Sequence, residues 1–272
     1  MNTRNRNALV IVLGILGLLL LCCCLAILGV NVLRPWAGGP LSGWGSYELV
    51  MPGQATASDT FSRRLEIDSP AVVVINAEVG DVTVRAGADG VVVVEAGLQA
   101  QARNRNAADD LLRRISVEAD SSGARATIRV DVPDGLMGAS ARVDLTITVP
   151  AEARLELGCN VGDIKIQRLE GEVSVSNNVG NISYDGRLPS SGSVELTTNV
   201  GNVAMLLDGG GSFRLNAVTD IGRIDSDLRL ESDDSGGEQG WVGERLSGSV
   251  GDDPRASVVL RTNTGNIEIH SR

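Results

Sequence analysis

Histidine, lysine and aromatic side chains are nearly absent from this sequence of 272 residues. It contains one histidine, His270, one lysine, Lys165, and only 3% aromatic residues. Three of its four cysteines are consecutive, at residues 22–24, and only Cys159 lies outside that run. One thiol cannot close an internal disulfide, so disulfides do not hold the C-terminal part together.

These absences disfavour an enzyme. A Ser-His-Asp triad would depend on His270, two residues from the C-terminus, where a frayed end is the simpler interpretation. Cys159 has no histidine nearby and lies among strand-forming residues, which favours a buried structural thiol. Lys165 alternates with isoleucines and should face solvent, which disfavours a Schiff-base role. Residues 209–212 lack the Gly-Lys-Ser/Thr ending of a phosphate-binding loop. We therefore predict no catalytic residue, no cofactor and no metal site.

The charge balance is strongly acidic. The formal net charge is −10, and every Asp and Glu follows residue 35. Such a surface repels the phosphates of nucleic acids, so a nucleic-acid partner is disfavoured. The simpler interpretation of this negative charge is that it keeps the protein soluble, rather than that it recognises a partner.

Residues 8–33 contain no charged side chain. A helix needs about 20 apolar residues to cross a bilayer, so this segment predicts one transmembrane helix in contact with the lipid bilayer. A signal peptide would have a shorter apolar run of about 7–15 residues and a small-x-small cleavage site. A lipoprotein would have a small residue directly before the lipid-modified cysteine, whereas Leu21 precedes Cys22, so this alternative is disfavoured. The sequence leaves open whether the segment is cleaved or residues 22–24 are acylated.

The charges around this segment predict its orientation. Arg4 and Arg6 precede it, and Arg34 alone follows it. The positive-inside rule then predicts a single-pass protein of the cell membrane, with residues 1–7 cytoplasmic and the C-terminal domain extracytoplasmic. Residues 34–60 are rich in Gly, Pro and Ser, which is typical of a linker before a domain of residues 61–272. Trp36 and Trp44 would alternatively rest among lipid headgroups.

One short unit recurs in this domain: an Asn-like residue, a spacer, Gly, Asp or Asn, then alternating apolar residues. Four close copies lie at residues 160–166, 178–184, 199–205 and 263–269, and looser copies lie at 78–84 and 220–224. Second strands are predicted between the units, at residues 172–175, 193–196, 212–215 and 257–260. The glycines at 162, 180, 201 and 222 recur at intervals of 18, 21 and 21 residues. The interval of 43 residues to Gly265 predicts two further turns with an insertion.

The repeated residues suit the corners of a stack of short strands. Alternation buries one side of each strand, glycine permits a positive φ at a sharp corner, and asparagine bonds to turn backbone. Stacked corners would align the asparagines in a hydrogen-bonded ladder. We predict these corner residues: Gly80, Asn160, Gly162, Asn178, Gly180, Asn199, Gly201, Gly222, Asn263 and Gly265. Neighbouring units complete one core, so the pattern predicts an all-β, solenoid-like stack. An ordinary antiparallel sandwich with recurrent Asn-Gly turns is the alternative.

The first half of the domain is less regular. Alternation predicts strands at residues 64–67, 71–76, 81–85, 91–98, 115–119, 126–132 and 142–149. Residues 106–114 predict the one short helix outside the membrane segment, with Asn106 as N-cap and Asp109 and Asp110 early in it. Residues 231–240, rich in Gly, Asp and Glu, predict a surface loop inserted in the repeat.

The order of these motifs resembles the DUF4097 family of β-strand-repeat domains, also described as toast-rack or adhesin-like domains. The likeness covers residues 61–272 and rests on the Val79-Gly80-Asp81-Val82 motif, the short helix, the strand ending in Val149-Pro150 and the repeats. It also includes the closing residues 246–251 and 260–267. The resemblance implies a right-handed β-solenoid-like fold without a defined reaction, and relatives often belong to bacterial envelope or stress-response contexts.

Acidic residues near the corners raise the alternative of calcium binding. They are Asp81, Asp163, Asp220, Asp225 and Asp227 at repeat turns and Asp233, Asp234, Asp252 and Asp253 in loops. Calcium takes about six to eight oxygen ligands, and the Gly-Gly-x-Gly-x-Asp repeat of calcium-binding β-helices is not reproduced. Solvated turn carboxylates are the simpler interpretation, and the sequence leaves calcium open.

We predict an adhesin-like or envelope-stress-related interaction module that presents a rigid, acidic face to an envelope protein or a glycan. The predicted contact surface comprises residues 231–240 with Lys165, Ser183, Glu195 and Glu268. A β-helix that binds or processes polysaccharide is the alternative. Processing needs paired carboxylates at a defined separation, and sugar binding usually needs exposed aromatic rings. The domain has Phe61, Tyr184, Phe213 and Trp241, of which we expect Tyr184 and Phe213 to pack inside.

Overall fold

The computed structural model describes residues 54–133, 138–209, 211–231 and 243–272. In these ranges, no helix has the length and apolar character that crossing a membrane requires. The predicted span at residues 8–33 lies outside the described residues, as does the predicted loop at 231–240 except for Glu231. The first strand begins at Ala55, within the segment 34–60 whose composition is typical of a linker.

The described residues form an all-β domain with one short helix, α2 (Arg105–Leu112). Its first strands are β1 (Ala55–Glu66), β2 (Val72–Val79), β3 (Val82–Gly87), β4 (Val91–Ala102), β5 (Ser116–Ser122), β6 (Arg125–Asp131) and β7 (Ser140–Pro150). The repeat region contains β8 (Arg154–Val161), β9 (Ile164–Gln167), β10 (Val173–Val179), β11 (Ile182–Gly186), β12 (Gly192–Val200), β13 (Val203–Leu207), β14 (Phe213–Ile221), β15 (Ile224–Ser226), β16 (Glu244–Val250), β17 (Ala256–Thr264) and β18 (Ile267–Ser271). The predicted strands are therefore confirmed, with shifted ends.

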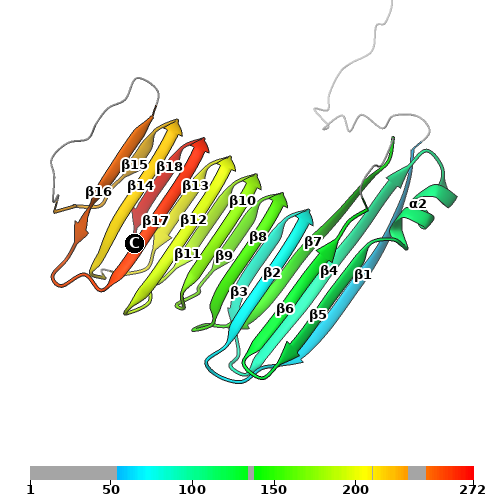
Figure 1. The fold of residues 1–272 in the computed structure, drawn as a ribbon, viewed down its shortest axis with the longest axis horizontal. Coiled ribbons are helices and arrows are strands. Elements are labelled where there is room, and N and C mark those ends of the chain that lie inside the picture. The colour runs from blue at the N-terminus through cyan, green and yellow to red at the C-terminus, as the bar shows by residue number, and fades with distance from the viewer. Residues whose placement is uncertain (1–53, 134–137, 210, 232–242) are drawn as a thin grey trace, which may run out of the picture. The chain divides into compact units, whose positions relative to one another are not determined.

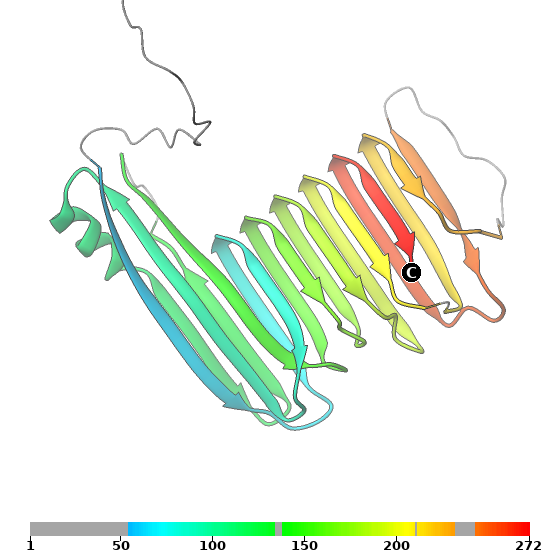
Figure 2. The same ribbon diagram turned by 180° about the vertical axis from the view of Figure 1, so that it is seen from behind.

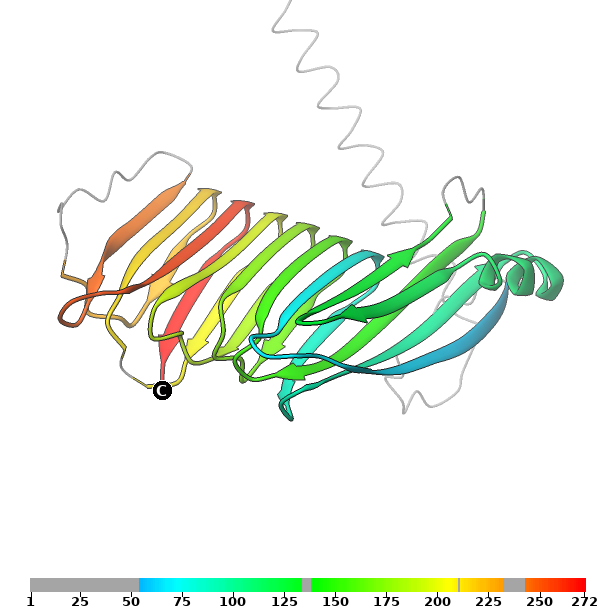
Figure 3. The ribbon, with the colours of Figure 1, turned by 60° about the horizontal axis from the view of Figure 1, so that its bottom comes forward.

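The strands form two nine-stranded sheets that face each other across one core. Sheet A has the order β1-β4-β7-β3-β9-β11-β13-β18-β15. Sheet B has the order β16-β14-β17-β12-β10-β8-β2-β6-β5. Figures 1 and 2 show the strands lying side by side along the stack, with α2 and β16 at opposite ends. Figure 3 shows the chain of the repeat region reversing direction at each corner, where one strand ends and the next begins.

Six strand pairs build the regular part, and we call each pair a rung. Rungs 1 to 6 are β2–β3, β8–β9, β10–β11, β12–β13, β14–β15 and β17–β18, each giving one strand to sheet B and the next to sheet A. Neighbouring rungs pair in parallel throughout. Antiparallel pairs occur among β1, β4 and β7, between β5 and β6, and between β14 and β16. The repeat half is thus solenoid-like. Within the described strands, antiparallel pairing, which the alternative of an ordinary sandwich predicted, occurs only towards the two ends of the sheets.

The rungs do not stack in chain order. Rung 6 lies between rungs 4 and 5, because β17 pairs with both β12 and β14 and β18 pairs with both β13 and β15. The 43-residue interval before Gly265 was therefore interpreted wrongly as two further turns. The chain passes rung 5, adds β16 along the far edge of β14, and returns to insert its last rung.

The core consists of side chains that alternate inward along every rung. In sheet B, for example, Val173 and Val175 are buried, whereas Ser174 between them is exposed. Parallel register then stacks apolar residues on one another, as Ile164, Ile182 and Val203 do in sheet A. Each fully buried aliphatic side chain stabilises the fold by about 1.5–3 kcal/mol, so the stack rather than any single rung supplies stability.

The helix begins earlier than predicted. Its N-cap is Asn104, whose side chain accepts a hydrogen bond from the Ala107 backbone N–H over 2.9 Å, so the choice of Asn106 was wrong. With this start, no acidic residue lies in the first turn. Helix α2 buries Ala108 and Leu111 against the domain.

The end of the stack beside rung 5 is covered by its own chain. Leu228 and Leu230 follow β15 and are partly buried against the core. Glu231 then forms two backbone hydrogen bonds with Ser249 of β16, of 2.8 and 3.0 Å. This crossing segment shields apolar side chains at a position where an open sheet end would favour association.

Tyr184 is the largest of the fully buried side chains in the stack. It is 1% exposed, and its hydroxyl lies 2.9 Å from the Arg187 carbonyl and 3.2 Å from the Leu169 carbonyl. Burial raises the pKa of the Tyr184 phenol, with Glu170 and Asp185 adding to the effect. Phe213 is also buried, at 2% exposed, so the expectation that both rings pack inside is confirmed.

We expect Tyr184→Phe to lower the free energy of unfolding by about 1–2 kcal/mol at pH 8, because the Leu169 and Arg187 carbonyls lose the hydroxyl donor that they share. Above about pH 10 the unfolded tyrosine ionises while the folded one stays neutral, so the parent loses more stability than the variant and the gap between them narrows. Cys159, whose pKa burial also raises, is present in both chains and cancels. Guanidinium unfolding followed by circular dichroism at pH 8 and pH 10.5 would measure this. A gap between the two chains that stays constant would contradict it.

Candidate functional site

Glycine corners join the two sheets at every rung. Gly180 has φ 135°, and a Cβ at this position would lie 2.0 Å from the Gly162 carbonyl oxygen of the neighbouring rung. The same positive φ and close approach recur at Gly80, Gly162, Gly201, Gly265 and Gly222. No side chain fits such a contact, so glycine permits the rungs to approach at normal strand spacing.

A ladder of asparagine side chains runs along the outside of these corners. Asn178 donates to Asn160 over 3.2 Å, and Asn199 donates to Asn178 over 2.8 Å. Asn263 donates to Asn199 over 3.1 Å, which places the last rung directly beside the fourth. Each amide can donate to one neighbour and accept from the other, so the ladder repeats without an unpaired end inside it.

A second column follows each glycine. Its side-chain oxygens accept the backbone N–H of the next rung: Asp81 from Asp163 (3.0 Å), Asp163 from Asn181 (2.8 Å), Asn181 from Asn202 (2.9 Å), Asn202 from Asn266 (2.8 Å) and Asn266 from Arg223 (3.0 Å). Two carboxylates of the calcium alternative, on Asp81 and Asp163, are therefore occupied in joining rungs. Within the described ranges, no three His, Cys, Asp or Glu residues are grouped so that they could hold a metal ion.

A third, buried column was not predicted from the sequence. Asn177, Thr198, Thr262 and Thr219 each lie three residues before a corner glycine and donate to the glycine carbonyl of the neighbouring rung, over 2.8–3.1 Å. Cys159 occupies the same position, with Sγ 3.9 Å from the Gly80 carbonyl, and burial raises the pKa of its thiol. An Asn or Thr three positions before four of the six corner glycines is the sequence signal that would have revealed this column.

The buried column predicts the effect of removing one hydroxyl. In the parent chain, the Thr262 hydroxyl donates to the Gly201 carbonyl over 2.8 Å. Thr262→Val keeps the shape of the side chain but removes this donor. We expect the free energy of unfolding to fall by about 1–2 kcal/mol. Thr197→Val, on the half-buried outer face of β12, is the control and should change it by less than about 0.5 kcal/mol. Chemical unfolding of both variants measures the difference, and equal losses would show that the buried hydroxyl is unimportant.

A stripe of apolar side chains accompanies the ladders on the surface. Val161, Val179, Val200 and Ile221, each directly before a corner glycine, are 40–53% exposed. Their carbonyls accept the N–H of the neighbouring rung's glycine at 2.8–2.9 Å. Thr264 takes this position in rung 6 and interrupts the stripe.

The residues predicted as a contact surface lie on two different faces. Lys165, Ser183 and Glu268 share one row on the outer face of sheet A. Glu195 projects from the outer face of sheet B, on the opposite side of the core. They therefore cannot form one continuous patch.

The side chains with catalytic potential are not brought together. Cys159 lies inside, Lys165 lies on the outer face of sheet A, and His270 belongs to β18. His270 is half-buried rather than frayed, with Nδ1 3.3 Å from an Asp227 carboxylate oxygen. Among the described residues, these groups supply no nucleophile with a base beside it.

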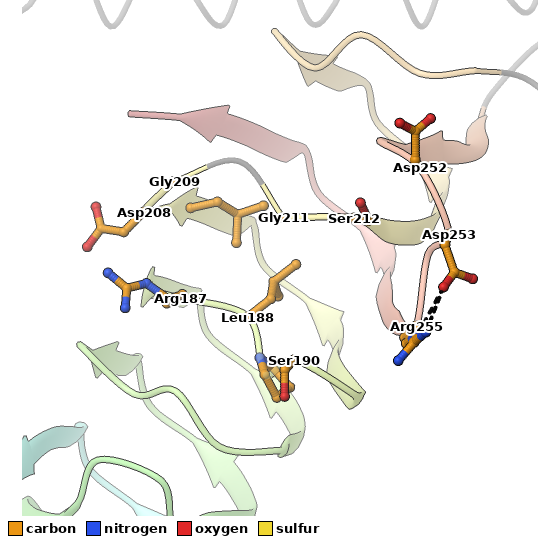
Figure 4. Close-up of a pocket in the computed structure, with 12 residues that line it drawn as sticks. Arg187, Leu188, Ser190, Asp208, Gly209, Gly211, Ser212, Asp252, Asp253 and Arg255 are labelled. Atoms are coloured by element: carbon orange, nitrogen blue, oxygen red, sulfur yellow. Dashed lines mark hydrogen bonds and ion pairs between the residues drawn. The ribbon is translucent and has the colours of Figure 1, made fainter.

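A pocket of about 320 Å³ lies among three loops, which join β11 to β12, β13 to β14 and β16 to β17. Figure 4 shows Arg187 and Asp208 on one side of it and Asp253 with Arg255 on the other. Four of its five charged side chains, all except Asp252, form local ion pairs: Arg255 with Asp253 at 2.9 Å, Asp208 with Arg272 at 3.1 Å and Arg187 with Glu170 at 3.5 Å. These pairs hold the loops in place and leave little free charge for a ligand.

Comparisons with known proteins show the fold. No family model matches the chain, and a sequence search of curated proteins finds no match. A crystal structure described as a "putative cell adhesion protein" from Clostridium sporogenes matches with a TM-score of 0.55 and 12% identity, covering 79% of this chain and all of that one. Structures described as "putative adhesins" from Bacteroides fragilis and Parabacteroides distasonis are 11% and 10% identical. They cover 78% and 79% of this chain and 97% of their own, but their TM-scores of 0.23 and 0.19 support no argument.

Proposed function

We propose that the chain is a membrane-anchored, extracytoplasmic, non-enzymatic interaction module of the adhesin-like type. Residues 8–33 would anchor it in the cell membrane, with residues 1–7 in the cytoplasm and the β domain outside. The proposal places this domain in the DUF4097 family that its motifs resemble. The description of the Clostridium sporogenes structure as a cell adhesion protein supports the same class of function.

One observation carries the proposal: the polar groups that could do chemistry are occupied in joining rungs. Asp81 and Asp163 accept backbone N–H groups, and Cys159 and Thr198 lie against glycine carbonyls. Rows of polar side chains, beside the apolar stripe at the corners, project outward and are held about 4.8 Å apart by the strands. A surface fixed in this way binds a partner without paying much ordering entropy, because the backbone is already rigid.

A polysaccharide ligand is the second candidate, favoured by one feature. The parallel rungs repeat polar positions at a constant spacing, which suits a polymer with a repeating structure. Sugar stacking on Tyr184 or Phe213 is impossible because both rings are buried. Recognition through charge and hydrogen bonds is therefore the favoured form of this alternative, and it extends the interaction module rather than replacing it.

The test uses the full chain in intact cells, with a photo-crosslinking residue placed at Lys165 or at Ser174. These exposed positions lie on the outer faces of sheets A and B. We expect capture of one envelope component from one face only, and loss of capture when neighbouring charges on that face are neutralised. Equal capture from both faces, or measurable breakdown of a polysaccharide by the purified chain, would contradict the proposal.

A second measurement tests the anchoring. A cysteine introduced at Ser174, in a chain whose residues 22–24 are serine, should react with a membrane-impermeant maleimide in intact cells. Cys159 is buried and provides the internal control, since it should react only after unfolding. If the introduced thiol reacts only after the cells are broken open, the proposed orientation is wrong.

A further inference from the structure

A basic surface lies on the outer face of sheet B, at the end formed by β16, β14 and β17. Arg214 of β14, Arg245 of β16 and Arg261 of β17 are exposed there. Register places Arg245 and Arg261 on either side of Val218, and Arg214 lies four residues earlier on the same strand as Val218. We call Arg214, Arg245 and Arg261 the arginine face.

A shallow depression of about 440 Å³ lies within this surface. Asn216 occupies its centre, in register with Ser247 on one side and Val259 on the other, and Ser257 lies beside Arg214. The amide and hydroxyl groups can both donate and accept hydrogen bonds. The depression thus combines a polar floor with cationic side chains at its borders.

The three guanidinium groups differ from Arg154 and Arg125 on the same sheet face, which are paired with carboxylates. Arg154 bonds to Glu156 at 3.2 Å and to Glu172 at 3.0 Å, and Arg125 lies 3.7 Å from Glu156. In contrast, no ion pair between described residues involves the arginine face. Two carboxylates lie close to it in the register: Glu195 of β12, which is adjacent to Val259, and Asp220 of β14, two residues after Val218. The surface therefore presents positive charge on a chain whose net charge is −10.

The spacing of these charges favours an extended ligand. Arg245 and Arg261 are two strands apart, about 10 Å, and Arg214 lies about 13 Å further along the strand direction. One small ion cannot reach all three positions, whereas a polymer with repeated anionic groups can. Guanidinium groups bind carboxylates through two parallel hydrogen bonds, so uronate residues suit them well.

We propose that the arginine face binds an acidic polysaccharide through its uronate carboxylates, with the Asn216 and serine groups contacting sugar hydroxyls. This inference rests on the proposed interaction function and names a class of partner for it. Binding by charge also accords with the burial of Tyr184 and Phe213, which leaves neither ring available to stack on a neutral sugar.

The test measures binding of polygalacturonate to the full chain, purified in a neutral detergent and immobilised for biolayer interferometry. We expect saturable binding that weakens several-fold when sodium chloride rises from about 50 to 200 mM. Arg245→Ala with Arg261→Ala should weaken it on the order of tenfold. Glu195→Gln should strengthen it about two- to threefold, because it removes a repelling carboxylate.

The matched control is Arg64→Ala with Arg85→Ala, which removes the same charge from the outer face of sheet A, where both side chains are exposed. This control should keep the parent affinity within about twofold. Equal weakening by the two double variants, equal binding of neutral dextran, or equal binding of a short single-stranded DNA would overturn the proposal. Should polygalacturonate fail to bind while the arginine double variant still captures its envelope partner, this inference falls and the interaction module stands.

Discussion

Gly180→Ala is expected to lower the free energy of unfolding by roughly 3–6 kcal/mol. The backbone at Gly180 has φ 135°, a conformation that strains any L side chain, and the new Cβ would lie 2.0 Å from the Gly162 carbonyl oxygen. That oxygen is fixed because its carbonyl also accepts the Asn177 side-chain N–H over 3.0 Å. Relief would require rungs 2 and 3 to separate, which disrupts core packing as well as the hydrogen bonds between them.

Gly97→Ala is the matched control, because the chemical change is identical and the surroundings are open. Gly97 is exposed in β4, and a Cβ there would meet no atom within 4 Å. We expect a change of less than about 1 kcal/mol, in the stabilising direction, since alanine restricts the unfolded chain. Urea unfolding of both variants in the same detergent measures the contrast. Similar losses for the two would show that the corners tolerate a Cβ and that the glycine column is not a constraint.

The strands and corners could be predicted from the sequence because they depend on local chemistry. Alternation along residues such as Val173 and Val175 places one side of a strand in the core wherever the rung is stacked. The Asn-x-Gly unit likewise identifies each corner by itself. Asn104 and Asn106 show the limit of local reasoning, since both can cap a helix, and the structure uses Asn104.

The order of the rungs could not be predicted by the same reasoning, because the corners are chemically alike. One signal was available in rung 5. Arg223 follows its glycine where the other rungs carry Asp or Asn, and its N–H bonds to Asn266 at 3.0 Å. A guanidinium has no acceptor to offer to a further rung, so rung 5 can only end the stack. Rung 6, with Asn266, had to lie inside it.

The candidate surface depends on this same order. Arg245 and Arg261 flank Val218 only because β17 returns to pair with β14 on one side while β16 pairs with it on the other. In the chain, these arginines are separated from Arg214 by an irregular stretch, and no periodicity connects them. The predicted contact residues do not form one patch because they also depend on the sheet arrangement: Glu195 belongs to sheet B and Lys165 to sheet A.

A disulfide between introduced cysteines at Val200 and Thr264 should form readily and stabilise the protein strongly. The two residues are direct partners on neighbouring parallel strands, and the Gly201 N–H donates to the Thr264 carbonyl over 2.9 Å. Parallel strands lie about 4.8 Å apart, which is within the Cα separation that a disulfide spans. Closing a loop of about 65 residues restricts the unfolded chain and should raise the free energy of unfolding by about 4 kcal/mol. Residues 22–24 are changed to serine, and peptide mass spectrometry after mild oxidation detects the bond.

The discriminating control joins Val200 to Ile221, the pair that stacking in chain order would bring together. In the structure β17 separates these strands, so their Cα atoms lie about 10 Å apart, beyond the reach of a disulfide. We expect no bond in the folded chain, although both side chains are well exposed at 49% and 53%. Formation of the Val200–Ile221 bond in place of the Val200–Thr264 bond would show that rung 5 follows rung 4 directly. Arg245 and Arg261 would then no longer flank one strand, so the arginine face would be lost together with the inserted rung.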